Sequence, residues 1–348
     1  MKKISLILFY LIISNLVFSQ NEILKIDSLV KATSIQNPEI GISVGFIEGN
    51  NQYFFNYGFT DRTKRIKVNE KATFEIGSIT KLVTSYLLLQ QVEAGKIHLD
   101  SMIDGYLPDF LELNSAIKNK IKVSDLASHQ SGLPGFDMMH LIEINPTQPL
   151  DEVTLEMVDS ILVNTTSLES FGSYRYSNIS YVLLGYIIEN VVGDTYENIV
   201  KNNMLQPFRM KNTYTTDYKR GVITTGYNMQ NERRDFLNWN SVMAPAGLLK
   251  SNSSDLVEFI RILLSPEYQA INDKLQNTYF KNTFIELGLG LNILRADDHV
   301  IYAKTGDSLG QSSVLAYNPK QKWGVVILTN QANSIAREVF GKIVKIMK

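Results

Sequence analysis

The sequence contains no cysteine, few histidines and no excess of charge of either sign. Without cysteine the chain has no disulfide, thiolate zinc site, iron–sulfur cluster, cysteine nucleophile or lipid-bearing cysteine. Its 34 basic and 35 acidic residues give a net charge of −1, so nothing in the charge balance favours nucleic acid or an anionic membrane as a partner. We expect no metal and no cofactor, because the four histidines lack metal-ligand spacing and suit structural or surface positions: His98, His129, His140 and His299.

Long hydrophobic runs are scarce too, and the one that stands out lies at the N-terminus. Lys2 and Lys3 precede an apolar stretch from Ile4 to Phe18, after which the chain turns polar. This pattern predicts a secretory signal peptide over residues 1–19, cut near residue 19 or 20. A membrane anchor is the alternative, but the run is shorter than the roughly 20 residues that a span needs. We therefore expect a secreted protein, which is periplasmic in a Gram-negative host and has no stable membrane anchor.

Hydrophobic periodicity predicts strands at both ends of the chain and helices between them. The predicted strands cover residues 41–47, 52–59, 287–294, 300–304, 312–317 and 324–329. The predicted helices cover residues 22–33, 78–94, 181–192, 254–264 (capped by residue 253 or 254) and 335–347. We expect an α/β fold of the α+β type, an antiparallel sheet flanked by helices. Residues 20–77 and about 205–348 would form the sheet domain, and about 78–204 an inserted all-helical domain.

One candidate nucleophile, Ser43, lies in a Gly-x-Ser-x-Gly sequence. This sequence matches the nucleophile elbow of α/β-hydrolases, which requires a strand that turns sharply into a helix. Here the segment continues into a predicted strand and hairpin, so we interpret Ser43 as a strand residue. His299, beside Asp297 and Asp298, could complete a triad in chain order, but the missing helix argues against it.

A second candidate is the Ser-x-x-Lys sequence of Ser78 and Lys81. In a helix, a lysine three residues after a serine lies on the same face, where a neutral amine can take the hydroxyl proton. The positive end of the helix dipole favours that neutral amine and an anionic oxygen. The spacing recurs twice in less suitable places, in a helix body and in a polar stretch: Ser28 with Lys31, and Ser115 with Lys118. Only Ser78 opens a predicted helix, directly after a glycine.

Two further motifs contain groups that suit such a site. Lys304-Thr305-Gly306 ends a predicted strand, where the glycine lets a substrate lie against the strand edge and the lysine can hold a carboxylate. Tyr176 and Asn178 form a Tyr-x-Asn sequence between the other two motifs. A tyrosine between two lysines is expected to have its protonation equilibrium shifted toward the phenolate form, which makes it a usable base. An asparagine offers a donor and an acceptor to a substrate amide.

In their order and context, the three motifs resemble the serine β-lactamase and penicillin-binding-protein family. Tyr-x-Asn in the middle position is similar to the class C β-lactamases and the related D-alanyl-D-alanine peptidases. The similarity extends to residues 124–134, which resemble the family's loop before the middle motif, and to residues 203–213, 247–251 and 325–330. It covers nearly all of the chain after the predicted signal peptide.

The resemblance implies a role for each residue of the reacting centre. Ser78 would be the acylated nucleophile, and Lys81 and Tyr176 would share the general-base and proton-relay work. The backbone N–H groups of Ser78 and Asp307 would form the oxyanion hole. No cofactor is implied.

The resemblance also implies the substrate contacts. Asn178 would orient the substrate amide, and Lys304 and Thr305 would hold the substrate carboxylate. Gly306 would be a substrate-binding residue at the strand edge. Arg337 aligns, across a gap, with an arginine that class C enzymes place near that carboxylate. The substrate would be a β-lactam or a D-alanyl peptide. Separately from the resemblance, we expect the protein to be a monomer.

One departure from the class C pattern leaves the substrate open. A glutamine that contacts the substrate acyl side chain in class C enzymes is replaced here by Phe136. The third motif, in contrast, begins with lysine rather than the histidine common in esterase-like relatives, which favours carboxylate-bearing substrates. The alternatives are an esterase or another D-amino-acid peptidase on the same scaffold, and a catalytically silent binding module.

Overall fold

The computed structural model describes residues 20–218, 221–296 and 299–348. The predicted signal peptide lies outside these residues, and so do Asp297 and Asp298 of the alternative triad. Within the described ranges, no helix is both long and apolar enough to cross a membrane.

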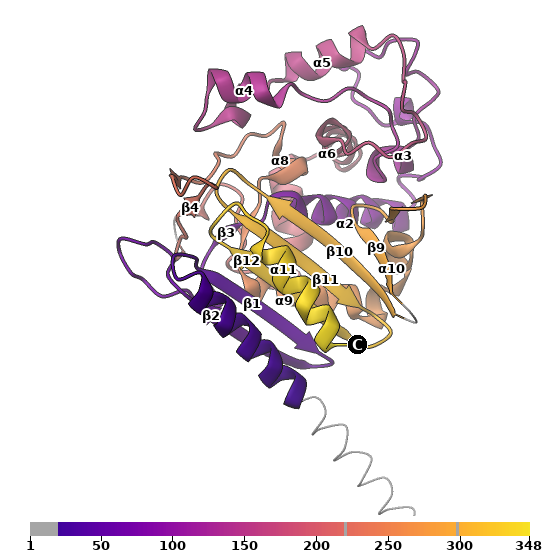
Figure 1. Ribbon diagram of the computed structural model, residues 1–348. Coiled ribbons are helices and arrows are strands. Elements are labelled where there is room, and N and C mark those ends of the chain that lie inside the picture. Colours follow the sequence, from indigo (N-terminus) through magenta and orange to yellow (C-terminus); the bar gives the residue numbers. More distant parts are fainter. Residues whose placement is uncertain (1–19, 219–220, 297–298) are drawn as a thin grey trace, which may run out of the picture.

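Among the described residues, an eight-stranded antiparallel sheet joins the two ends of the chain, in the order β2-β1-β12-β11-β10-β9-β8-β7 (Figure 1). The strands are β1 (Ile42–Glu48), β2 (Asn51–Tyr57), β7 (Phe280–Lys281), β8 (Glu286–Leu287), β9 (Asn292–Ala296), β10 (His299–Asp307), β11 (Ser312–Asn318) and β12 (Trp323–Thr329). Along its whole length β1 pairs with β12, which brings the N-terminal hairpin beside the C-terminal strands. The predicted fold class, helices with an antiparallel sheet from both chain ends, is confirmed.

Each face of the sheet is covered by helices because its strands alternate buried apolar side chains between the two faces. Ile42 and Val44 of β1 face a helix at residues 20–36 and helix α11 (Ile335–Ile346). Val326 and Leu328 of β12 belong to the core on the other face, where helix α9 (Ser253–Leu264) packs. In Figure 1 the N-terminal helix and α11 lie on the same side of the sheet.

Helix α2 (Thr80–Glu93) lies between the sheet side of the molecule and the helices of the chain's middle part (Figure 1). It packs against α6 (Asn178–Val192), α8 (Ala244–Gly247) and α10 (Gln269–Gln276), and nearly all of its side chains are buried. The remaining helices are α3 (Val123–Ala127), α4 (Met138–Ile144), α5 (Leu155–Asn164), α7 (Tyr196–Val200), η1 (Gly77–Ile79), η2 (Ile103–Gly105), η3 (Pro149–Glu152), η4 (Lys201–Leu205) and η6 (Pro266–Tyr268). Short strand pairs complete the chain: β3 (Phe74–Glu75) with β6 (Lys250–Ser251), and β4 (Gly226–Tyr227) with β5 (Arg233–Arg234).

Two local expectations from the sequence are wrong. The strand predicted over residues 287–294 is two short strands, β8 and β9, because the chain turns between them and Gly290 has a φ of 74°. The N-cap of α9 is Asn252, whose Oδ1 accepts the backbone N–H of Asp255 at 2.9 Å, and not residue 253 or 254.

Two glycines let the 3₁₀ turn η1 lie directly against the end of β10. A Cβ on Gly306 would lie 2.0 Å from the carbonyl oxygen of Ile76 and 2.8 Å from the amide nitrogen of Ser78. A Cβ on Gly77, whose φ is 49°, would lie 2.6 Å from the carbonyl oxygen of Asp307. Since real atoms do not approach this closely, any side chain at either position would force the two backbones apart.

We predict that Gly306→Ala destabilises the protein by about 1–3 kcal/mol or more, since 1–3 kcal/mol is the usual cost of forcing extra atoms into a close-packed contact. Gly341 in α11 provides a matched control, because a Cβ there meets nothing within 4 Å. Gly341→Ala should stabilise by about 0.5–1 kcal/mol, since alanine is the better helix former. Urea unfolding of both variants measures this, and equal stability of the two would contradict the contact described above.

Candidate active site

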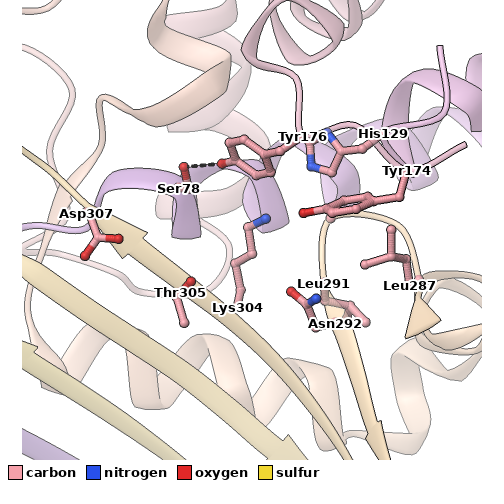
Figure 2. Close-up of a pocket in the computed structure, with 12 residues that line it drawn as sticks. Ser78, His129, Tyr174, Tyr176, Leu287, Leu291, Asn292, Lys304, Thr305 and Asp307 are labelled. Atoms are coloured by element: carbon pink, nitrogen blue, oxygen red, sulfur yellow. Dashed lines mark hydrogen bonds between the residues drawn. The ribbon is translucent and has the colours of Figure 1, made fainter. Parts of the chain in front are cut away.

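The three sequence motifs meet around one cavity of about 320 Å³ (Figure 2). Ser78 reaches it from η1, Tyr176 from the segment just before α6, and Lys304, Thr305 and Asp307 from the end of β10. Separate elements of the fold therefore bring together residues that are far apart in the sequence.

Ser78 is hydrogen-bonded on both sides. The Tyr176 hydroxyl lies 2.5 Å from Ser78 Oγ, and Lys81 Nζ lies 3.1 Å from the same oxygen. These contacts place a proton donor and an amine beside the Ser78 hydroxyl, in the turn that precedes α2. The arrangement matches the requirement that a serine nucleophile have a base within hydrogen-bond reach.

Lys81 is completely buried, and its amine has three oxygen neighbours. Besides Ser78, Lys81 Nζ donates to Asn178 Oδ1 at 2.8 Å and to the carbonyl oxygen of Ala246 at 2.5 Å. Both of these atoms can only accept hydrogen bonds, so they take the two hydrogens of a neutral amine. The lone pair of that amine is then left for the hydroxyl proton of Ser78.

The electrostatic surroundings favour this neutral amine. Burial lowers the pKa of Lys81 well below its usual value, and the charge of Lys304 lowers it further. Lys304 is also buried, 5% exposed, and burial lowers its pKa to about 8. Figure 2 shows the Lys304 ammonium group pointing into the cavity, toward Tyr176.

Tyr176 lies between the two lysines but is not a phenolate. Its ring is 5.0 Å from Lys81 Nζ and 5.1 Å from Lys304 Nζ. Although 45% of the residue is exposed, desolvation raises the pKa of Tyr176 to about 12, and Tyr174 and Asp307 add to the rise. The expectation of a tyrosine near the phenolate is therefore wrong, because desolvation raises the pKa of Tyr176, and its neutral hydroxyl donates to Ser78 Oγ.

The remaining predicted residues lie at the edge of the cavity or behind it. Thr305 and Asp307 line the cavity, and Gly306 allows the close contact with η1. Asn178 is the first residue of α6 and is held by Lys81. Arg337, in the first turn of α11, pairs with the Asp307 carboxylate rather than lining the cavity itself.

The alternative nucleophiles do not form a site. Ser43 is the second residue of β1 and is buried, and its hydroxyl bonds to Asn56 and Ser253, as expected for a strand residue. Ser28 and Ser115 are exposed, and so are the lysines three residues after them. His299 begins β10, five residues before Lys304, which places it far down the strand from the cavity.

His129, Tyr174 and Asn292 also line the cavity, although sequence reasoning did not select them. The sequence prediction placed all four histidines at structural or surface positions. His98 and His140 are exposed, whereas His129 is buried beside the cavity. The available signal was its position within residues 124–134, the loop that resembles the family. Across the described residues, no group of three or more histidine, aspartate or glutamate side chains could hold a metal ion.

The chain is similar to known proteins over nearly its whole length. The family model described as Beta-lactamase matches residues 26–344. "Protein flp" of Staphylococcus aureus (strain MW2) is 26% identical over 321 residues, which cover 88% of this chain and only 62% of that protein. A Beta-lactamase of Providencia stuartii is 25% identical, with 88% of this chain and 86% of that protein covered. A class C beta-lactamase crystallised with cefoxitin has the same fold, with a TM-score of 0.81, 24% identity, and 94% and 99% of the two chains covered.

We predict that Lys304→Met stabilises the protein at pH 7 by on the order of 3 kcal/mol while removing a cavity charge. The folded pKa, about 8, lies below the ordinary value of 10.5. The unfolded chain therefore binds the proton more tightly, and the cost of burying the charge is present in full below pH 8. That cost disappears as the pH rises through 10.5, so the gain should shrink below about 1 kcal/mol at pH 10.

Urea unfolding at the two pH values tests the prediction. Exposed Lys118→Met is the control and should change stability by less than about 0.5 kcal/mol at either pH. A Lys304→Met variant less stable than the parent at pH 7 would refute the conclusion that the buried charge of Lys304 destabilises the fold.

Proposed function

The chain belongs to the beta-lactamase family of serine hydrolases, and we propose that it forms an acyl-enzyme on Ser78 and hydrolyses β-lactams or D-alanyl-D-alanine peptides. The observation that carries this proposal is the unbroken line of hydrogen bonds from Tyr176 through Ser78 to Lys81. It supplies a nucleophile, a base for its proton and a hydroxyl that can protonate a leaving nitrogen.

In acylation, Ser78 Oγ bonds to the carbonyl carbon of the substrate amide as its proton passes to Lys81 Nζ. The resulting ammonium group of Lys81 donates to Asn178 Oδ1 and to the carbonyl oxygen of Ala246, the same acceptors that held the neutral amine. When the tetrahedral intermediate collapses, the amide C–N bond breaks and the Tyr176 hydroxyl gives its proton to the nitrogen. The proton on Lys81 then restores Tyr176, so the net transfer is from the serine to the leaving amine.

Hydrolysis of the ester follows the same route in reverse. Water attacks the acyl carbon, its proton passes to the Tyr176 and Lys81 pair, and Ser78 Oγ leaves as the hydroxyl. The products are the free acid and the original enzyme. How fast this step runs distinguishes a β-lactamase from a penicillin-binding peptidase, since both share the acylation chemistry.

The backbone N–H groups of Ser78 and Asp307 would hold the oxyanion. The contact between the two backbones at Gly77 and Gly306 supports this, because it brings the segments that carry the two N–H groups side by side. An N–H at the start of a helical turn has no partner within the turn and suits this purpose. The loss of one such donor typically costs about 3 kcal/mol of transition-state stabilisation.

Substrate selection would rest on charge at the end of β10. Lys304 and Thr305 face the cavity beside Ser78, and Arg337 lies just behind the Asp307 carboxylate. A penicillin and a D-alanyl peptide both carry a carboxylate close to the amide that is cleaved, so this end of the strand suits either. Phe136 packs partly buried against the hydrophobic core and so offers no amide to an acyl side chain.

We predict that a penicillin and a cephalosporin each add their mass to the protein once, and that Ser78→Ala abolishes the adduct. Intact mass spectrometry over time makes the measurement. Ser115→Ala is the matched control, because Ser115 also precedes a lysine by three residues but lies exposed outside the cavity, and it should acylate normally.

The time course decides between the possible activities. An adduct that vanishes as the drug is consumed identifies a β-lactamase, and an adduct that persists identifies a penicillin-binding peptidase. If no adduct forms but Ser78-dependent ester hydrolysis occurs, the enzyme is an esterase and the proposed substrate class is wrong.

We further propose that the enzyme is exported, on the basis of the basic and apolar pattern of residues 1–19. Expressed with its full sequence in a Gram-negative host, the protein should be recovered from the periplasm without these residues. N-terminal sequencing should begin near residue 20. Recovery of the uncut chain from the cytoplasm would contradict the proposal.

A further inference from the structure

The segment that carries Tyr176 is held on both sides by His129. The backbone N–H of Arg175 donates to the carbonyl oxygen of His129 at 2.9 Å, and the N–H of Ser177 donates to His129 Nδ1 at 3.2 Å. Between these two bonds, the imidazole packs against the Tyr176 ring, with centroids 4.6 Å apart and planes tilted by 40°. One residue thus fixes the backbone before Tyr176, the backbone after it and the ring itself.

His129 reaches this position through an unusual backbone conformation. Its φ is 60°, in the left-handed region that residues other than glycine adopt infrequently. The side chain is 4% exposed and lines the cavity that contains Ser78. Figure 2 shows the imidazole beside the Tyr176 ring, on the side away from Ser78.

Only the neutral imidazole with its proton on Nε2 fits these contacts. Nδ1 accepts a backbone N–H, so it carries no proton, and the hydrogen bond of one ring nitrogen sets the state of the other. In the described part of the chain, Nε2 is buried and has no hydrogen-bond partner. The groups facing the ring are Lys81 of α2, Lys304 of β10, and Tyr174, Tyr176 and Tyr181. Burial and then the two lysines lower the pKa of His129 well below its usual value.

We propose that His129 is a positioning residue for the proposed reaction: as the neutral imidazole it holds the Tyr176 hydroxyl on Ser78 Oγ, ready for proton transfer. This rests on the proposed function, because it assumes that Tyr176 transfers the proton. His129 itself touches neither Ser78 nor the leaving nitrogen. It contributes by fixing the position of the Tyr176 hydroxyl. A misplacement of about 1 Å in such a group can lower the rate about a hundredfold.

Two substitutions separate the acceptor from the ring. His129→Phe keeps an aromatic ring but removes the acceptor for Ser177. His129→Asn removes the ring but provides an oxygen near Nδ1, and asparagine tolerates the left-handed backbone. With a chromogenic cephalosporin as substrate, His129→Phe should lower kcat at least about tenfold with KM changed less than about threefold, and His129→Asn should recover most of kcat. Equal losses in the two variants, or losses confined to KM, would overturn the proposal.

A double-mutant cycle tests whether the effect passes through Tyr176. If it does, His129→Phe should change kcat less than about threefold in a Tyr176→Phe background. The same factor in both backgrounds would mean a general structural role and would overturn the proposal. If Tyr176→Phe alone leaves kcat unchanged, the catalytic role proposed for Tyr176 fails, and with it the positioning role that depends on it.

A readout without substrate tests the contact itself. Two-bond ¹H–¹⁵N spectra of the histidine-labelled protein distinguish the two neutral tautomers, and the His129 signals are those missing from His129→Asn. We expect the proton on Nε2 at neutral pH and no titration of this ring near pH 6.5, the ordinary value for histidine. A proton on Nδ1, or titration near pH 6.5, would overturn the proposal even if the enzyme hydrolyses no β-lactam.

Discussion

The chemistry proposed for this protein depends on an amine that has no access to water. Lys81 lies within the protein, and its two fixed acceptors, Asn178 Oδ1 and the carbonyl oxygen of Ala246, serve the charged and the neutral amine equally well. Burial makes the neutral amine the more stable of the two forms, because it penalises the charged form. These two hydrogen bonds can therefore be kept while a proton arrives at Lys81 and leaves it.

This arrangement is costly for the fold, which must hold two lysines, Lys81 and Lys304, in its interior without an acidic partner among the ion pairs of the described residues. The cost is met by the large apolar cores on the two faces of the sheet. The same sheet supplies rigidity. Its strand β10 ends directly against η1, so the proposed nucleophile and the predicted oxyanion donors are fixed by backbone contact rather than by flexible side chains.

Much of the fold could be predicted from the sequence, because strands and helices differ in the spacing of their apolar residues. The clustering of Ser78, Tyr176 and Lys304 was implied by the resemblance of the three motifs, in their order, to the serine β-lactamase and penicillin-binding-protein family. The protonation state of Tyr176 did not, since desolvation depends on three-dimensional enclosure that no local pattern reports. His129 was missed for a related reason: its function comes from contacts with a segment nearly fifty residues away, and a lone histidine in a sequence does not reveal such a partner.

The placement of β10 has a consequence for when the enzyme can become active. Strand β10 pairs with β11, β11 with β12, and β12 with β1, so the strand that completes the site belongs to a sheet closed by the last strands of the chain. During synthesis Ser78 and Lys81 emerge long before Lys304. Without β10, the cavity beside Ser78 lacks Lys304, Thr305 and Asp307. The proposed reaction therefore requires that folding has reached the C-terminal strands of the sheet.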